Sequence, residues 1–126
     1  MAKGSTVVYV IDDDESVRKA LARLLRSASL HAETFCSPEE FLAGLRQEKD
    51  ACVIADIRMP GSTGFDLQKG ITAAGMRLPI IVVSASDDEQ TREHARRLGA
   101  VAFFRKPVDD QALLDAIWWA MAAAGK

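Results

Sequence analysis

Cysteine is scarce in this sequence, which contains only Cys36 and Cys52 among its 126 residues. Two cysteines are too few for the disulfide framework of a small secreted domain, and they lack the further cysteines or clustered histidines of a zinc site. We therefore expect both to be buried free thiols, because unpaired cysteine is among the residue types most often found in protein interiors.

A long apolar run and an excess of one charge are also missing. The apolar segment at residues 7–11 is too short, and too quickly followed by acids, to be a secretory signal. Acids and bases are mixed along the chain and the formal net charge is only -2, so no nucleic-acid or membrane surface is expected. These absences predict a cytoplasmic protein that binds neither nucleic acid nor membranes directly.

Internal repeats, low-complexity tracts and evident linkers are absent as well. A length of 126 residues is that of one ordinary domain, and 48% hydrophobic residues provide enough material for a single buried core. We expect one domain over residues 1–126, without an output domain in this chain.

Five short segments predict β-strands. Residues 7–11, 51–55 and 79–83 are rich in valine and isoleucine without regular polar alternation, which is typical of strands buried on both faces of a parallel sheet. Weaker runs at 31–35 and 101–104 have strand length and are bounded by turn or helix-start residues.

Helical patterns fill the gaps between these strands. Apolar residues recur at helical spacing from Val17 to Leu25, and Ser37-Pro38-Glu39-Glu40 is a good start for a second helix. Further helices are expected at 64–74, 88–98 and 109–123. The strict alternation predicts a doubly wound α/β fold, with five helices on the two faces of a five-stranded parallel sheet.

Polar residues follow four of the five predicted strands. Ligands of such sheets bind outside the carboxyl ends of the strands, so these residues are the first candidates for a site. In chain order they are Asp12-Asp13-Asp14, Asp56, Ser84-Ala85 and Lys106-Pro107. Three of these four carboxylates, a hydroxyl and an ammonium group should therefore meet at one edge of the sheet.

Carboxylates crowded at one edge repel one another unless a cation neutralises them. Mg²⁺ suits such a site, because it accepts a few oxygen ligands and leaves positions open for water and phosphate. With the metal and Lys106 screening its charge, Asp56 could attack phosphorus and form an aspartyl phosphate. Phosphoryl transfer mainly needs positioning and charge neutralisation, which the metal, Lys106 and the Ser84 hydroxyl can supply.

These motifs, with Val10-Ile11 before the first acids and residues 57–61 after Asp56, resemble a response-regulator receiver domain over essentially the whole chain. The stretch from Asp12 to Arg18 is most similar to the FixJ-like branch, whose members usually carry a C-terminal helix-turn-helix output domain. The resemblance implies a flavodoxin-like fold with strand order 2-1-3-4-5. It also implies a regulatory domain rather than an enzyme, which assists only its own phosphotransfer and dephosphorylation, with a sensor histidine kinase as the phosphoryl donor.

The resemblance implies metal ligands and a phosphoacceptor. Asp56 would receive the phosphoryl group and also bind Mg²⁺. Asp13 would bind the metal directly, Asp12 would bind it through water, and the backbone carbonyl of Arg58 would complete the protein ligands.

The remaining matching positions would transmit the signal. Ser84 would move to bond the phosphoryl group, Lys106 would pair with it, and Phe103 would turn inward as the switch aromatic. A cis peptide bond is expected before Pro107. Ser84 stands where threonine is more frequent in the family, and Phe103 where tyrosine is frequent. Neither change removes the switch chemistry.

Ala55 departs further from the family pattern, because a bulkier aliphatic residue commonly precedes the phosphoacceptor. The lost volume should lead to a compensating neighbour or a looser site.

Other interpretations compete with the switch. The acids at 12–14 could merely cap a helix. Asp56 could be the transient nucleophile of a hydrolase similar to haloacid dehalogenases, but Arg58 stands where those enzymes need a second acid. A flavin- or nucleotide-binding module would need a glycine-rich phosphate loop after a strand, and none is present. A receiver-like interaction module that works without phosphorylation is the main alternative.

Two adjacent tryptophans in the last predicted helix, Trp118 and Trp119, cannot both face the core, because neighbouring helical residues lie about 100° apart. The buried stripe should comprise Leu113, Leu114, Ile117 and Met121, which leaves Trp119 nearly opposite. Our hypothesis is that the fourth and fifth helices, including Trp119, carry homodimer or output contacts. Trp119 lying flat on the surface is the alternative, and the arginines of the fourth helix are more typical of a solvated face.

Overall fold

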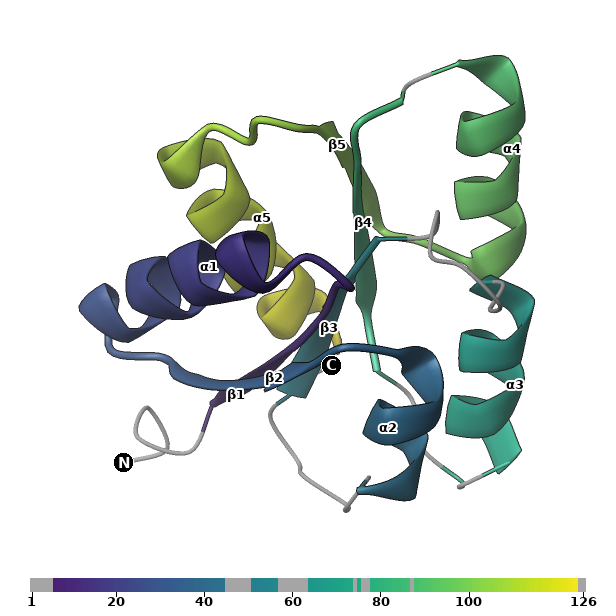
Figure 1. Cartoon of the computed structure of the whole chain (residues 1–126), viewed down its shortest axis with the longest axis horizontal. Helices are drawn as coiled ribbons and strands as arrows, with labels where there is room; N and C mark the ends of the chain where they lie inside the picture. The colour runs from purple at the N-terminus through teal and green to yellow at the C-terminus, as the bar shows by residue number, and fades with distance from the viewer. Residues whose placement is uncertain are drawn as a thin grey trace.

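A computed structural model describes residues 6–44, 51–56, 64–73, 75, 78–86 and 88–124. Strands and helices alternate along these residues as predicted (Figure 1). In chain order the elements are β1 (Val7–Ile11), α1 (Glu15–Ser27), β2 (His31–Phe35), α2 (Pro38–Ala43), β3 (Ala51–Ala55), α3 (Gly64–Ala73), β4 (Ile80–Ser84), α4 (Glu89–Leu98), β5 (Ala102–Arg105) and α5 (Asp110–Ala124).

Small differences from the predicted bounds have local causes. β4 begins one residue later than expected, after Pro79, which has no N–H to donate to the sheet. α4 and α5 also begin one residue later, because Asp88 and Asp109 precede them and accept hydrogen bonds from backbone N–H groups of the first turn. The acids expected inside these helices therefore cap them.

The strands form one parallel sheet in the order β2-β1-β3-β4-β5, which confirms the predicted topology. Figure 1 shows α1 and α5 on one face of the sheet and α2, α3 and α4 on the other. The strand order reverses direction between β1 and β3, and in such sheets the site forms at this switch point. Ile11 pairs with Ala55 across these two strands, so the residues that follow, Asp12 and Asp56, emerge at the same level.

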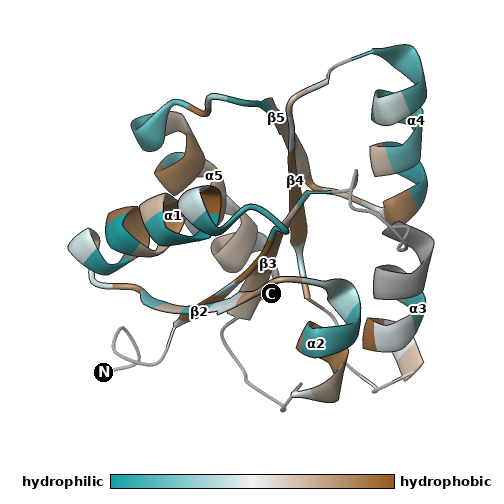
Figure 2. Cartoon of the chain, in the orientation of Figure 1, coloured by the Kyte–Doolittle hydropathy of each residue, from teal (hydrophilic) through white to brown (hydrophobic). Residues whose placement is uncertain are grey.

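The core lies on both faces of the sheet. Every residue of β1, β3 and β4 is buried, which explains why these strands show no polar alternation. In β1, Val8 and Val10 face the side of α1 and α5, whereas Tyr9 and Ile11 face the side of α2, α3 and α4. Figure 2 shows hydrophobic central strands and hydrophilic residues on the outer surfaces of α1 and α4. Among the described residues, no helix has both the length and the apolar character needed to span a bilayer.

The turn between β2 and α2 corrects one expectation and confirms another. Ser37 caps α2 by accepting a hydrogen bond from the Glu40 N–H, and Pro38 occupies the first turn, as predicted. Cys36 was expected to be buried, but it is exposed, because it lies in the surface turn that follows the edge strand of the sheet.

Cys52 is buried in β3, and burial raises the pKa of its thiol to about 12.

The side chain of Phe41 should contribute strongly to stability. It is fully buried, and its ring lies 5.2 Å from that of Tyr9 and 5.4 Å from that of Phe35. We expect Phe41→Ala to lower the free energy of unfolding by about 3–5 kcal/mol in urea denaturation, because the truncation leaves a cavity. The matched control is Trp119→Ala, an aromatic that is 60% exposed, which should change stability by less than about 1 kcal/mol. Equal losses for the two variants would contradict this assignment of the core.

Candidate functional site

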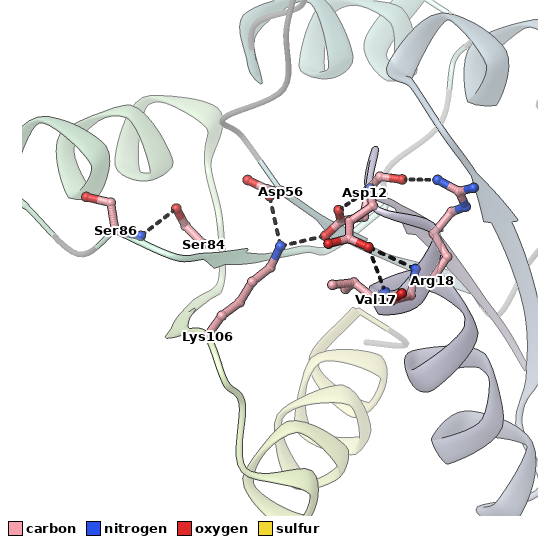
Figure 3. Close-up of polar contacts among 9 residues, drawn as sticks. Asp12, Val17, Arg18, Asp56, Ser84, Ser86 and Lys106 are labelled. Carbon is pink, nitrogen blue, oxygen red and sulfur yellow. Dashed lines mark hydrogen bonds and ion pairs between the residues drawn. The ribbon is translucent and has the colours of Figure 1, made fainter.

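Three side chains from distant parts of the sequence meet at the carboxyl ends of the strands. Asp12 directly follows β1, Asp56 directly follows β3, and Lys106 follows β5. Lys106 Nζ donates hydrogen bonds to Asp12 Oδ2 at 2.8 Å and to Asp56 Oδ2 at 2.9 Å. Figure 3 shows the ammonium group of Lys106 between the two carboxylates. Both aspartates are buried, so these bonds compensate charges that would otherwise be costly to remove from water.

The charge of Lys106 is itself stabilised by this arrangement. Burial on its own lowers the pKa of a lysine, but the hydrogen bonds and negative charges of Asp12 and Asp56 outweigh that effect and raise the pKa of Lys106 above its ordinary value. Lys106 therefore remains a cation at neutral pH.

Asp13 adds a third carboxylate to the pair. One carboxylate oxygen each from Asp12, Asp13 and Asp56 lies within 4.8 Å of the others. Asp13 differs from Asp12 and Asp56 because it is exposed, and in the described part of the chain its carboxylate has no hydrogen-bond or ion-pair partner. Such a carboxylate can turn toward an incoming ion without breaking an existing bond.

This donor set fits a hard divalent cation. Three carboxylates with one ammonium group leave two formal negative charges, which one divalent ion would balance. Oxygen-only donors, one of them solvent-facing, match the preference of Mg²⁺ for a few protein oxygens and several waters. Asp12, Asp13 and Asp56 would hold the ion. The predicted fourth ligand, the backbone carbonyl of Arg58, lies outside the described residues.

The main chain around Asp12 is tightly held. Its N–H donates to the carbonyl of Phe35 in β2 at 3.1 Å, and its Oδ1 accepts from the N–H of Asp14 at 2.9 Å. Its carbonyl accepts from Nη1 of Arg18 at 2.7 Å. Sequence reasoning missed the contact from Arg18, because no short motif indicates that a helical arginine folds back onto the preceding turn.

Asp14 caps α1 and does not belong to the acidic cluster. Its Oδ1 accepts hydrogen bonds from the N–H groups of Ser16 at 2.8 Å and Val17 at 3.4 Å. A purely capping role therefore describes Asp14, while Asp12 and Asp13 lie near Asp56.

Ser84 ends β4 at the same edge of the sheet. It is fully buried, and its Oγ accepts a hydrogen bond from the Ser86 N–H at 3.2 Å (Figure 3). Its carbonyl accepts from the N–H of Lys106 at 2.8 Å, which ties β4 to the residue that bridges the carboxylates. The peptide bond between Lys106 and Pro107 is cis, as predicted.

Phe103 lies half-buried in β5, on the side of α4. The guanidinium of Arg92 lies 5.4 Å from the centre of its ring, within the range of a cation–π interaction. The sequence indicated a solvated face for the arginines of α4, and this describes Arg96 and Arg97, which form exposed ion pairs with Glu93. For Arg92 the cation–π contact is an addition that the sequence did not reveal.

Ala55 lies directly behind the site. It is buried in β3 between Ile11 of β1 and Val82 of β4, and it belongs to the core cluster on the side of α2, α3 and α4. Only a methyl group therefore fills the position just before Asp56.

Comparison with known proteins identifies relatives of this chain. The family model of the response regulator receiver domain matches residues 8–118. Response regulator protein TodT of Pseudomonas putida is 38% identical over 98% of this chain and 55% of its own length. For transcriptional regulatory protein FixJ of Azorhizobium caulinodans, the identity is 40% over 90% of this chain and 54% of the relative. The chain thus spans about half the length of these relatives.

Solved structures agree with the sequence comparison. The response regulator StyR superimposes with a TM-score of 0.84 and 41% identity, covering 95% of this chain and 61% of StyR. FixJ-N superimposes with a TM-score of 0.83 and 31% identity, covering 93% of this chain and 94% of FixJ-N.

The carboxylate cluster predicts stabilisation by Mg²⁺. An ion that binds only the folded state raises the free energy of unfolding, by about 2.7 kcal/mol at a concentration 100 times its Kd. We expect MgCl₂ to raise the thermal midpoint of the wild type, and Asp13→Asn to lose most of this increase while remaining folded.

The control for this experiment is Asp115→Asn, which alters an exposed aspartate of α5. It should retain the full shift, and NaCl at matched ionic strength should not reproduce it. Equal shifts for the wild type and Asp13→Asn would remove Asp13 from the metal site.

Proposed function

Because the chain belongs to the response-regulator receiver family, whose members are regulatory rather than catalytic, we propose that it is a phosphorylation-activated switch with Asp56 as phosphoacceptor. The observation that carries the proposal is the bridge from Lys106 Nζ to Asp12 and Asp56, with the Asp13 carboxylate close by. This arrangement supports the proposal, because Asp56 as the nucleophile would have a fixed cation and a set of oxygens suited to a metal ion beside it.

The proposed donor is a phosphohistidine of a sensor histidine kinase. A carboxylate oxygen of Asp56 forms a bond to phosphorus as the bond from phosphorus to the histidine nitrogen breaks, so no general base is needed. Mg²⁺, when bound, would neutralise charge on the phosphoryl oxygens. Lys106, already 2.9 Å from Asp56 Oδ2, supplies a second positive charge at the same place. Hydrolysis of the acyl phosphate resets the switch.

A kinase must dock beside Asp56, and an apolar groove lies between α1 and α5. Its volume is about 430 Å³, and Lys106 is one of its lining residues. Most of the others are apolar: Val17, Ala20, Leu21, Leu24, Val83, Pro107, Val108 and Leu113. A helix that carries the phosphohistidine could lay an apolar face here while its imidazole reaches the acidic site.

The signal would leave the site through β4 and β5. In the proposed active state, the Ser84 hydroxyl exchanges its bond with the Ser86 N–H for one with the phosphoryl group. Phe103 then turns inward and leaves the guanidinium of Arg92. These movements change the surface formed by α4, β5 and α5.

We propose that this surface binds a second copy of the chain. Trp119 is 60% exposed, as the helical pattern predicted, and Val101, the residue just before β5, is also exposed. A groove of about 280 Å³ between α4 and β5 includes Val101 and Phe103 among its lining residues, so it would change when Phe103 moves. In this proposal the output comes from a domain or protein outside this chain. The switch would act in the cytoplasm, and this chain would not itself contact nucleic acid or membrane.

The chemistry can be tested by incubation with acetyl phosphate and MgCl₂, followed by intact-mass measurement. We expect the wild type to gain the mass of one phosphoryl group, and Asp56→Asn to gain none, because an amide is not a nucleophile toward phosphorus. Chelation of the metal should abolish the adduct. An adduct that persists in Asp56→Asn would reassign the acceptor, and no adduct on either protein would favour an interaction module that works without phosphorylation.

Dimerisation is tested by sedimentation of the phosphorylated protein. We expect Trp119→Ala to weaken phosphorylation-dependent self-association about tenfold or more, because exposed tryptophans are common interface anchors. Trp118→Ala is the matched control, since this tryptophan precedes Trp119 and lies about 100° away around the helix. Association that is unchanged in Trp119→Ala would mean that this side chain only lies on the surface.

A further inference from the structure

Arg18 makes the shortest hydrogen bond to Asp12 among those described above. It lies in the first half of α1, is half-buried, and its Nη1 donates to the Asp12 carbonyl at 2.7 Å (Figure 3). A bond from a guanidinium is charge-assisted and stronger than a bond between neutral groups. Arg18 touches none of the candidate ligand carboxylates in the contacts found for the described residues, so any influence on the metal must pass through the main chain.

The bonded carbonyl belongs to the peptide unit that joins Asp12 to Asp13. This unit is planar, so fixing its carbonyl also fixes the direction of the Asp13 N–H and the position of the Asp13 Cα. The preceding peptide unit is fixed by the bond from the Asp12 N–H to the Phe35 carbonyl. The turn that carries both acids is therefore held at its two peptide planes by β2 on one side and α1 on the other.

The position of the Asp13 carboxylate depends on this turn more than that of the Asp12 carboxylate does. Asp12 is anchored by bonds to its carboxylate from the Asp14 N–H and Lys106, whereas the exposed Asp13 carboxylate has no partner within the described residues. Without such a bond, its place within 4.8 Å of the other two carboxylates depends on where the backbone positions its Cα.

We propose that Arg18 is a positioning residue for the metal site, which orients Asp13 toward the ion by holding the Asp12 carbonyl. The inference rests on the proposed function of this site. An electrostatic role would act in the opposite direction, because a positive charge near the carboxylates opposes binding of a cation. The two roles therefore predict changes of opposite sign when the charge is removed.

The experiment is isothermal titration calorimetry of the full chain with MgCl₂, for wild type, Arg18→Gln, Arg18→Lys and Arg26→Gln. Arg26 is the matched control because it lies on the same helix and its Nη2 also donates to a backbone carbonyl, that of Ala32 at 3.4 Å, away from the acidic cluster. We expect Arg18→Gln to raise the Kd for Mg²⁺ about 10-fold or more, as is usual when a group that orients a ligand is lost. Arg26→Gln should leave this Kd within about twofold of the wild type.

Phosphorylation by acetyl phosphate gives a second readout. In Arg18→Gln the Mg²⁺ concentration for half-maximal rate should rise as the Kd does, while the rate at saturating Mg²⁺ approaches that of the wild type, because Asp56 and Lys106 are intact. Arg18→Lys keeps the charge but lacks the planar guanidinium, so its Kd should lie between those of the wild type and Arg18→Gln. This variant also decides the matter if Arg18→Gln fails to fold.

The outcomes separate this inference from the proposed function. Mg²⁺ binding that is unchanged or tighter in Arg18→Gln would overturn the positioning role, even if the wild type forms its adduct on Asp56. A wild type that binds Mg²⁺ but forms no adduct would overturn the proposed function, while the Kd values still decide the role of Arg18. A wild type that binds no Mg²⁺ would overturn both.

Discussion

The ionic bridge between Lys106 and the two buried carboxylates is the interaction on which the site depends. Asp12 and Asp56 are removed from solvent almost completely, and either charge would be costly to bury without a partner. The bridge compensates both charges only if β1, β3 and β5 end at the same edge of the sheet. It does not complete the neutralisation, because the Asp13 carboxylate lies nearby, and the remaining negative charge is what makes the site suitable for a divalent cation.

The parallel sheet provides the rigid frame for this bridge. Strands that are buried on both faces cannot shift without exposing apolar side chains, so the pairing of Ile11 with Ala55 fixes the level at which Asp12 and Asp56 emerge. The backbone N–H of Asp56 donates to the Ile11 carbonyl at 3.1 Å and continues the ladder into the site. The candidate site residues Asp12 and Asp56 thus directly extend two of the most buried strands.

Helices connect the same site to two surfaces. On one face, Arg18 joins α1 to the turn that carries Asp12 and Asp13. On the other, Phe103 of β5 lies under Arg92 of α4, and Ser84 is bonded to Lys106 through the backbone. Arg18 thus links the site to α1, and the Ser84–Lys106 bond links it to β5, the strand whose Phe103 lies against Arg92 of α4. This linkage is the physical basis for proposing a switch in a family whose members are regulatory.

The sequence alone determined the alternation of strands and helices, because burial on both faces and capping residues leave local patterns at 7–11, 51–55 and Ser37-Pro38. It also determined the candidate site, since Asp12, Asp56 and Lys106 each follow a predicted strand. Only the tertiary structure decided which side chains bond to each other. The contacts of Arg18 and Arg92 and the exposure of Cys36 depend on how separate elements pack. The spacing of residues along the sequence does not specify the distances between side chains in the folded protein.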